Sequence, residues 1–311
     1  MSFPSSFAIP QYISKPGGWK PNRVAQKQLR PYTADFIMTK VEHKSMLILG
    51  AGWTSTFLIP LLEEENISYT ATSTTGREET VKFVFDPTSD DSAPYKKLPS
   101  AETVLITFPL KGQGQSKHLH DLYSKTHPQA SARFIQLGST GIFQIPNQTL
   151  WVTRHSPYDK TDPRAIAEDE LLELGGCVLD LAGLWGGSRM PRTFIKRVVV
   201  TKEQLKTKKS LHLVHGKDVA RSILALHHSF TPGQRWLLTD LFVYDWFALI
   251  MGWGDGSSEG DASGPHIDWV REVMEEEGIQ ALPRSMEALG RCYDSREFYI
   301  TFKFSPIQAR V

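Results

Sequence analysis

The sequence has little of several features that mark whole classes of protein. It holds two cysteines, Cys177 and Cys292, which lie far apart among its 311 residues. Such usage argues against a disulfide framework and favours a reducing compartment. No apolar stretch runs uninterrupted for about 18 residues, so we expect no membrane span. The net charge is only +1, which argues against nucleic acid or an anionic membrane surface as the main partner.

Residues 1–44 lack the regular apolar spacing of the rest. As far as Lys40 they carry five prolines, six basic residues and a single acid, Asp35, and they show no apolar core of a secretory signal. We expect an extension that is disordered or poorly packed, and a cytoplasmic protein. A mitochondrial presequence is an alternative, although a Pro-rich stretch makes a poor amphipathic helix. Another alternative is that the gene model begins too far upstream, because Met46 stands at the start of the first expected strand and would serve as the initiating methionine.

From Met46 onward, segments typical of strands alternate with segments typical of helices. The expected strands cover 46–49, 67–72, 81–86, 102–109, 133–143, 177–185, 236–240 and 299–304. The expected helices cover 57–65, 115–127, 163–174, 212–228 and 266–279. The segment 212–228 begins with a short strand, and Asp218 is expected to cap the helix that follows. This alternation predicts an α/β fold, a Rossmann-type doubly wound parallel sheet with a smaller C-terminal substrate domain. We assign 45–185 to the dinucleotide-binding domain and 186–311 to a mixed α/β region, some of whose elements return to the Rossmann core. The five glycines of 252–264 predict an exposed loop.

The stretch GAGWTS (50–55) follows the first expected strand and opens a helix. In that context Gly50 permits a tight turn, and Gly52 lets the backbone approach a pyrophosphate at the helix N-terminus. Trp53 and Thr54 complete the turn and are expected to contact the cofactor. The third glycine of the usual pattern is missing, because Ser55 stands there. A tight turn that binds nothing is the alternative.

The end of the second expected strand indicates which nicotinamide cofactor fits. Proteins that bind NAD usually place an acid there, which bonds the ribose 2′-hydroxyl. Here the sequence is TSTTGRE (72–78). No acid stands at the end of the strand, and a row of hydroxyl side chains that includes Ser73 is followed by Arg77. A 2′-phosphate needs a cation and hydrogen-bond donors, so NADP(H) is preferred over NAD(H). The alternative is that Arg77 is a solvated loop charge.

Several segments together resemble a known family. LILGAGWTSTFL, FIQLGSTGIF, RAIAEDELL, VLDLAGLWGGSRMP and LVHGKDVARSILAL stand in the order of the extended short-chain dehydrogenases. The set is similar to the atypical branch of the NAD-dependent epimerase/dehydratase family, over residues 46–311. The resemblance implies an NAD(P)H-binding Rossmann domain closed by a smaller domain. It implies that Ser139 holds the place of the catalytic Ser/Thr and contacts the cofactor beside the nicotinamide. It also implies that Phe108 and Pro109 line the cofactor and that Asp86 lies near the adenine.

The family's catalytic helix carries Tyr-x-x-x-Lys, followed four residues later by Glu. In SPYDKTDPRAIAE (156–168) Glu168 matches that Glu, but Arg164 takes the Lys place and Lys160 the Tyr place. Pro163 disfavours helix at Asp162, so the stretch is better explained as a helix entrance, with Asp162 as its cap. Tyr158 offers an alternative acid if it swings in from the preceding loop toward Ser139.

The remaining polar clusters do not add a second chemistry. His118 and His120 are two apart on a polar helix and do not make a metal pair, so we expect no metal site. The sequence therefore predicts an NADP(H)-binding oxidoreductase-like protein that acts on an unspecified small molecule and lacks the usual dyad. A non-catalytic NADP(H)-binding sensor or scaffold is the alternative.

Overall fold

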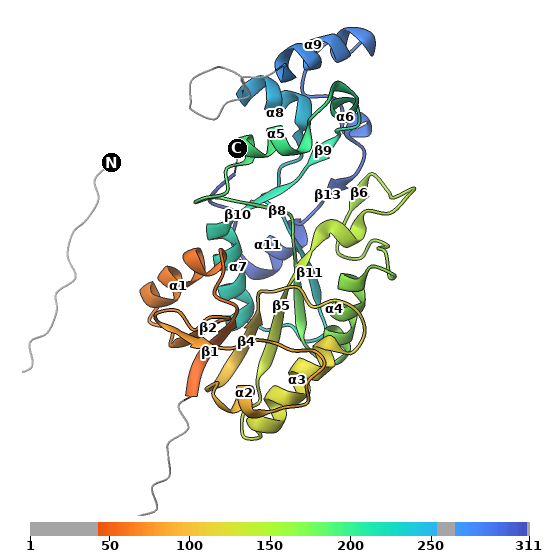
Figure 1. The fold of residues 1–311 in the computed structure, drawn as a ribbon. Coiled ribbons are helices and arrows are strands. Elements are labelled where there is room, and N and C mark those ends of the chain that lie inside the picture. Colours follow the sequence, from red (N-terminus) through yellow and green to blue (C-terminus); the bar gives the residue numbers. More distant parts are fainter. Residues whose placement is uncertain (1–42, 254–264, 310–311) are drawn as a thin grey trace, which may run out of the picture. The chain divides into compact units, whose positions relative to one another are not determined.

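The structure is a computed structural model that describes residues 43–253 and 265–309 (Figure 1). The account below concerns the unit Val41–Val311. The expectation for the N-terminal extension therefore lies almost wholly outside the described residues. The same holds for the expected loop from 254 to 264, whereas residues 252 and 253 close a helix.

A single parallel sheet forms the centre of the described unit. Its seven strands are β1 (His43–Leu49), β2 (Tyr69–Ser73), β3 (Thr80–Lys82), β4 (Ser100–Ile106), β5 (Arg133–Ser139), β7 (Cys177–Leu181) and β11 (Arg235–Leu238). They lie in the order β11-β7-β5-β4-β1-β2-β3, and each neighbouring pair is parallel. β1 is an inner strand between β2 and β4. The predicted Rossmann-type fold is confirmed.

Helices cover both faces of this sheet, and the inner strand β1 accordingly buries apolar side chains on both faces. Met46 and Ile48 of β1 face the layer of α1 (Ser55–Glu64) and α7 (Gly216–His228). Leu47 and Leu49 face the opposite layer, made by α2 (Ala93–Lys96), α3 (Gln115–Thr126) and α4 (Pro163–Glu173). Figure 1 shows α1 and α7 on one side of the sheet and α3 and α4 on the other.

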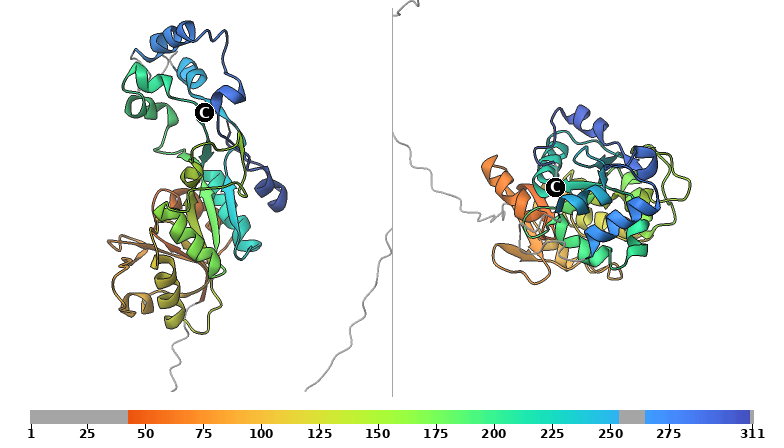
Figure 2. Two further views of the ribbon diagram at one scale, coloured as in Figure 1. Left: turned by 90° about the vertical axis from the view of Figure 1, so that its right-hand side faces the viewer. Right: turned by 90° about the horizontal axis from the view of Figure 1, so that it is seen from above.

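Most of the remaining elements gather beyond the carboxyl ends of the sheet strands (Figures 1 and 2). They are β8 (Gly183–Trp185), η2 (Pro191–Phe194), α5 (Ile195–Val198), α6 (Lys202–Lys206), β9 (Ser210–Leu211), β10 (Leu213–His215), β12 (Tyr244–Asp245), α8 (Trp246–Trp253), α9 (His266–Glu276) and α10 (Met286–Leu289). Helices α5, α6, α8 and α9 share a separate apolar core around Phe247, Ile250 and Val270. Two further short strands, β6 (Trp151–Val152) and β13 (Cys292–Tyr293), pair with each other, and η1 (Thr140–Phe143) follows β5.

Three expectations about elements are wrong. Residues 177–185 are two strands, because β8 leaves the main sheet to pair with β10. Residues 299–304 are no strand: most of them belong to helix α11 (Arg296–Phe302), whose Phe298 and Phe302 lie one turn apart and pack against Trp236. The cap of α7 is His215, whose Nδ1 accepts a hydrogen bond from the Lys217 N–H, whereas Asp218 accepts the backbone N–H groups of Ile307 and Gln308.

Candidate functional site

The turn after β1 lies at the point where the strand order of the sheet reverses. β2 continues on one side of β1 and β4 lies on the other, so a crevice opens beyond their carboxyl ends. Gly50 has φ +95°, in the left-handed region, and a Cβ there would approach Thr107 Oγ1 at 2.7 Å. A glycine is therefore required at this first position, as the sequence predicted.

The same turn presents backbone donors that the fold leaves unused. The Trp53 and Thr54 N–H groups donate no hydrogen bond within the described part of the chain, whereas the neighbouring Gly52 and Ser55 N–H groups are bonded inside the turn. A Cβ on Gly52 would meet nothing closer than the Gly50 carbonyl, at 4.0 Å, so this side of the turn is open. Free N–H groups at the start of the ten-residue helix α1 favour an anion.

A cavity of about 390 Å³ begins at this turn. It is lined by the turn residues Gly50, Ala51, Gly52, Trp53 and Thr54, by Ser73, Thr74 and Arg77 after β2, by Thr107 and Phe108 after β4, and by Leu184 and Arg189. The structure thus brings together seven residues predicted to bind the cofactor: Gly50, Gly52, Trp53, Thr54, Ser73, Arg77 and Phe108. Sequence reasoning did not single out Arg189, although it lies in the quoted stretch VLDLAGLWGGSRMP.

The Arg77 side chain is directed back toward the turn after β1. Its guanidinium donates a hydrogen bond to the Ala51 carbonyl, and the Ser73 hydroxyl accepts the backbone N–H groups of Gly76 and Arg77. Gly76 has φ +68°, and a Cβ there would come within 2.8 Å of Lys82 Cβ. The loop is therefore folded tightly, and it places a cation at the cavity. Arg77 forms no ion pair with any described residue.

Three of the residues predicted to bind the cofactor, Asp86, Pro109 and Ser139, do not line this cavity, so their place at the cofactor stays a prediction. Phe108 lines the cavity and stacks on Phe85, with ring centroids 5.9 Å apart. The Asp86 carboxylate accepts the hydroxyl and the backbone N–H of Thr88, and these bonds lower its pKa. Its proposed place near the adenine stays a prediction.

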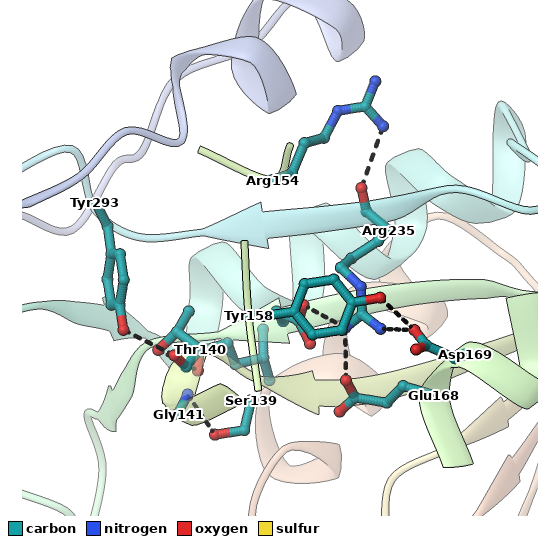
Figure 3. A network of polar contacts seen from close by, with 11 residues as sticks. Ser139, Thr140, Gly141, Arg154, Tyr158, Glu168, Asp169, Arg235 and Tyr293 are labelled. Carbon is teal, nitrogen blue, oxygen red and sulfur yellow. Dashed lines mark hydrogen bonds and ion pairs between the residues drawn. The ribbon is translucent and has the colours of Figure 1, made fainter. Parts of the chain in front are cut away.

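Ser139 and Tyr158, the two candidates for catalysis, point in different directions (Figure 3). Ser139 ends β5, and its hydroxyl accepts the Gly141 N–H over 3.2 Å. The Tyr158 hydroxyl donates to Asp169 over 2.8 Å, and the Arg235 guanidinium lies 4.8 Å from the Tyr158 ring centroid. Burial and the bond to Asp169 raise the pKa of Tyr158 to about 12. In this structure Tyr158 packs against Arg235 and bonds the same Asp169 carboxylate that Arg235 binds.

A buried charge cluster lies behind these residues, and sequence reasoning missed it. Arg235 on β11 donates to Glu168 over 2.6 Å, to Asp180 over 2.8 Å and to Asp169 over 2.8 Å. The carboxyls of Glu168 and Asp180 lie against Gly138 of β5, where a Cβ would come 2.7 and 2.1 Å from their oxygens. A glycine at 138 therefore makes room for two acids inside the core.

Two buried acids share the charge of one arginine, and this changes their protonation. Burial raises the pKa of Glu168 to about 8, and the charge of Asp180 adds to the effect. Burial raises the pKa of Asp180 as well. One oxygen of each carboxyl has no hydrogen-bond partner in the described residues. Both shifts favour retention of a proton by the pair, because two bare carboxylates side by side in the core oppose each other's ionisation.

The predicted helix entrance is confirmed. Asp162 is the N-cap of α4, its carboxylate accepts the Arg164 N–H over 2.7 Å, and Pro163 is the first helical residue. Lys160 lies before the helix, 6.0 Å from the Tyr158 ring centroid. Lys160 and Arg164 therefore do not form a dyad on one helix face.

Two searches of the described residues bear on other classes of function. Among those residues, no group of three or more His, Cys, Asp or Glu side chains could hold a metal ion. None of the helices in the described ranges has both the length and the apolar character needed to span a bilayer. His118 bonds the Ser89 carbonyl and His120 the neighbouring Asp121, so each has a local partner.

Comparisons with solved structures find the same fold. Vestitone reductase from alfalfa (Medicago sativa) is 16% identical, with a TM-score of 0.60 over 86% of this chain and 94% of that one. A short-chain dehydrogenase/reductase superfamily protein from Agrobacterium tumefaciens with bound NAD is 12% identical, with a TM-score of 0.58 over 85% and 93%. RMD from Pseudomonas aeruginosa, complexed with NADPH, is 11% identical, with a TM-score of 0.55 over 85% and 95%.

These likenesses confirm the resemblance to short-chain dehydrogenases at the level of the fold. A scan against protein-family models and a search of curated proteins both give no match. What the chain binds must therefore be argued from its own residues.

Proposed function

We propose that this protein binds NADP(H) at the turn after β1 and is an oxidoreductase-like protein for a small molecule. One observation carries the proposal: the unused Trp53 and Thr54 N–H groups and the guanidinium of Arg77 line one cavity at the switch point of a Rossmann-type sheet. These groups fit a dinucleotide, because the N–H groups suit its pyrophosphate and the arginine suits a further phosphate.

The residues around Arg77 favour a 2′-phosphate over a free ribose. The described residues that line the cavity include Ser73 and Thr74 beside Arg77 but no Asp or Glu. A carboxylate there would accept hydrogen bonds from ribose hydroxyls and repel a phosphate, whereas hydroxyls and a guanidinium donate to phosphate oxygens. The structural neighbours named above include proteins solved with NAD and with NADPH, which supports a nicotinamide cofactor without choosing between the two.

The chemistry on the substrate side depends on a proton donor. A bound nicotinamide would supply hydride exchange with a substrate carbon. Ser139 can hold a substrate oxygen, but a serine alone is a weak acid. Tyr158 would have to leave Asp169 to act, and Arg164 does not release its proton. We therefore infer slow or absent turnover on ordinary carbonyl substrates. The hydrogen bond from Tyr158 to Asp169 favours a second candidate function, a sensor or scaffold protein that binds NADP(H) but does not catalyse a reaction.

Titration with NADPH and NADH tests the cofactor assignment. NADPH should bind more tightly to the native chain. Replacement of Arg77 by alanine should weaken NADPH by roughly tenfold or more, the effect of one lost charged hydrogen bond, and leave NADH nearly unchanged. Lys111, which is exposed and lies outside the cavity, offers a matched control, since Lys111→Ala removes the same charge. Equal affinities for the two cofactors would refute the preference for NADP(H).

A further inference from the structure

The segment after β8 folds back toward the turn after β1. Gly186 and Arg189 exchange backbone hydrogen bonds of 2.8 and 3.0 Å, which closes a tight hairpin. Gly186 and Gly187 have φ values of +110° and +55°, both in the left-handed region. A Cβ on Gly186 would come 2.3 Å from His215 Nε2. The hairpin thus depends on glycine, and it determines where the Arg189 side chain emerges.

Two contacts join this hairpin to the turn after β1. The Trp53 indole N–H donates to the Gly186 carbonyl over 3.2 Å. The Arg189 guanidinium carbon lies 4.5 Å from the Trp53 ring centroid, in a cation–π contact. The Phe57 ring packs against the indole in a T-shaped arrangement, with centroids 4.9 Å apart. Residues from the second half of the chain therefore cover the first turn of the Rossmann unit.

Arg189 brings a cation to the cavity without an acid to neutralise it. The side chain lines the cavity together with Gly50, Gly52 and Thr54. It forms no ion pair and no side-chain hydrogen bond with the residues of 43–253 and 265–309. An uncompensated guanidinium beside two unused N–H groups is suited to an anion that both can reach.

We propose that Arg189 binds the pyrophosphate of the dinucleotide, from the side opposite the Trp53 and Thr54 N–H groups. This inference rests on the proposed function and goes beyond it by assigning separate phosphates to the two arginines. Arg77 belongs to the adenosine end, because it follows β2, where the ribose 2′ position is recognised. Arg189 belongs to the pyrophosphate, because it stacks on the residue whose own N–H is unused. Trp53 holds the hairpin in place for this contact.

Binding measurements on the full chain separate the two roles. We would titrate NADPH and NADH against the native chain and the variants Arg189→Gln, Arg77→Ala and Lys196→Gln. Arg189→Gln should weaken both cofactors by about tenfold or more, since both carry a pyrophosphate. Arg77→Ala should weaken NADPH alone. Lys196→Gln removes the same charge from an exposed position on α5 outside the cavity and should change neither affinity.

A second pair of probes locates the phosphate. ADP carries a pyrophosphate and AMP does not, so Arg189→Gln should weaken ADP more than AMP. Trp53→Phe keeps a ring under Arg189 but removes the bond to Gly186, and it should weaken both nicotinamide cofactors to a smaller extent. Thermal unfolding of each variant verifies that it is folded, and Arg189→Lys should retain part of the affinity because it keeps the charge.

The outcomes that overturn the inference differ from those that overturn the proposed function. If native chain binds NADPH while Arg189→Gln binds both cofactors within about twofold of it, Arg189 does not bind the pyrophosphate. Weakening of NADPH alone by Arg189→Gln would place Arg189 at the 2′-phosphate and also refute the inference. A native chain that binds neither NADPH nor NADH would refute the proposed function itself.

Discussion

The Arg235 guanidinium donates to the Glu168 carboxylate over 2.6 Å inside the core, where both side chains are buried. The two residues lie 67 positions apart, on β11 and α4. The bond ties the edge strand of the sheet to the helix that carries the catalytic dyad in the family this sequence resembles. Here the same helix carries part of an internal charge cluster.

Loss of Arg235 should destabilise the fold strongly. Arg235→Met fills similar space but leaves the carboxyls of Glu168, Asp180 and Asp169 without their shared partner. Breaking one side of a buried ion pair costs about 3–5 kcal/mol. Denaturant unfolding would measure the loss. Arg296→Met removes an exposed arginine paired with Asp294 and serves as the control, with an expected loss of about 0–1 kcal/mol. Equal losses in the two variants would contradict a core role for Arg235.

The raised pKa of Glu168 predicts a pH dependence of stability. Between its ordinary value of 4.5 and its folded value of about 8, the native chain holds a proton that the unfolded chain has released. Stability from this group is therefore fully present below pH 4.5 and is lost as the pH rises toward 8, by up to about 1.4 kcal/mol per pH unit. Above that window its contribution no longer changes.

Glu168→Gln isolates this contribution. Glutamine mimics the protonated acid and does not titrate, so the variant lacks the decline. The free energy of unfolding of the variant, minus that of the native chain, should grow from pH 5 to pH 8. Denaturant unfolding at several pH values would measure the difference. Parallel curves would show that Glu168 titrates near its ordinary pKa.

The two glycines of the turn after β1 should respond differently to alanine. In Gly50→Ala, the left-handed backbone and the nearby Thr107 hydroxyl both oppose a Cβ, so the thermal midpoint should fall. In Gly52→Ala, the Cβ meets nothing closer than the Gly50 carbonyl, at 4.0 Å, so the thermal midpoint should stay nearly unchanged. Affinity for NADPH should nevertheless fall in Gly52→Ala, because the methyl group takes the place through which a pyrophosphate approaches. Undiminished binding by a folded Gly52→Ala would mean that the cofactor lies elsewhere.

Turnover with NADPH on generic aldehydes and ketones should be slow or absent, because the hydroxyl of the proposed proton donor, Tyr158, is hydrogen-bonded to Asp169. If turnover is measured, Tyr158→Phe should remove most of it, while Lys160→Ala should matter less. The same Tyr158→Phe variant loses the bond to Asp169 and about 1 kcal/mol of stability. Brisk activity that survives both changes would place the proton donor at another residue.

The turn after β1 was largely predictable because its conformation depends on residues adjacent in the sequence. Gly50, Gly52 and the start of α1 are set by neighbours in the sequence, and Arg77 follows β2 by a few residues. The helix entrance at Asp162 and Pro163 is likewise a matter of adjacent backbone. The error at 299–304 had the opposite origin. The segment has strand-like composition, but Phe298 and Phe302 gain burial against Trp236 only as a helix.

The sequence by itself determined the alternation of strands and helices, and with it the parallel sheet and the turn after β1, since apolar periodicity and turn residues act over short distances. Only the tertiary structure decided which distant groups meet. It brought Arg189 onto Trp53, and it surrounded Arg235 with Glu168, Asp169 and Asp180. Such pairings depend on how the strands are ordered and how their crossovers pack. The sequence shows which side chains are charged, but the tertiary structure determines which residues they contact.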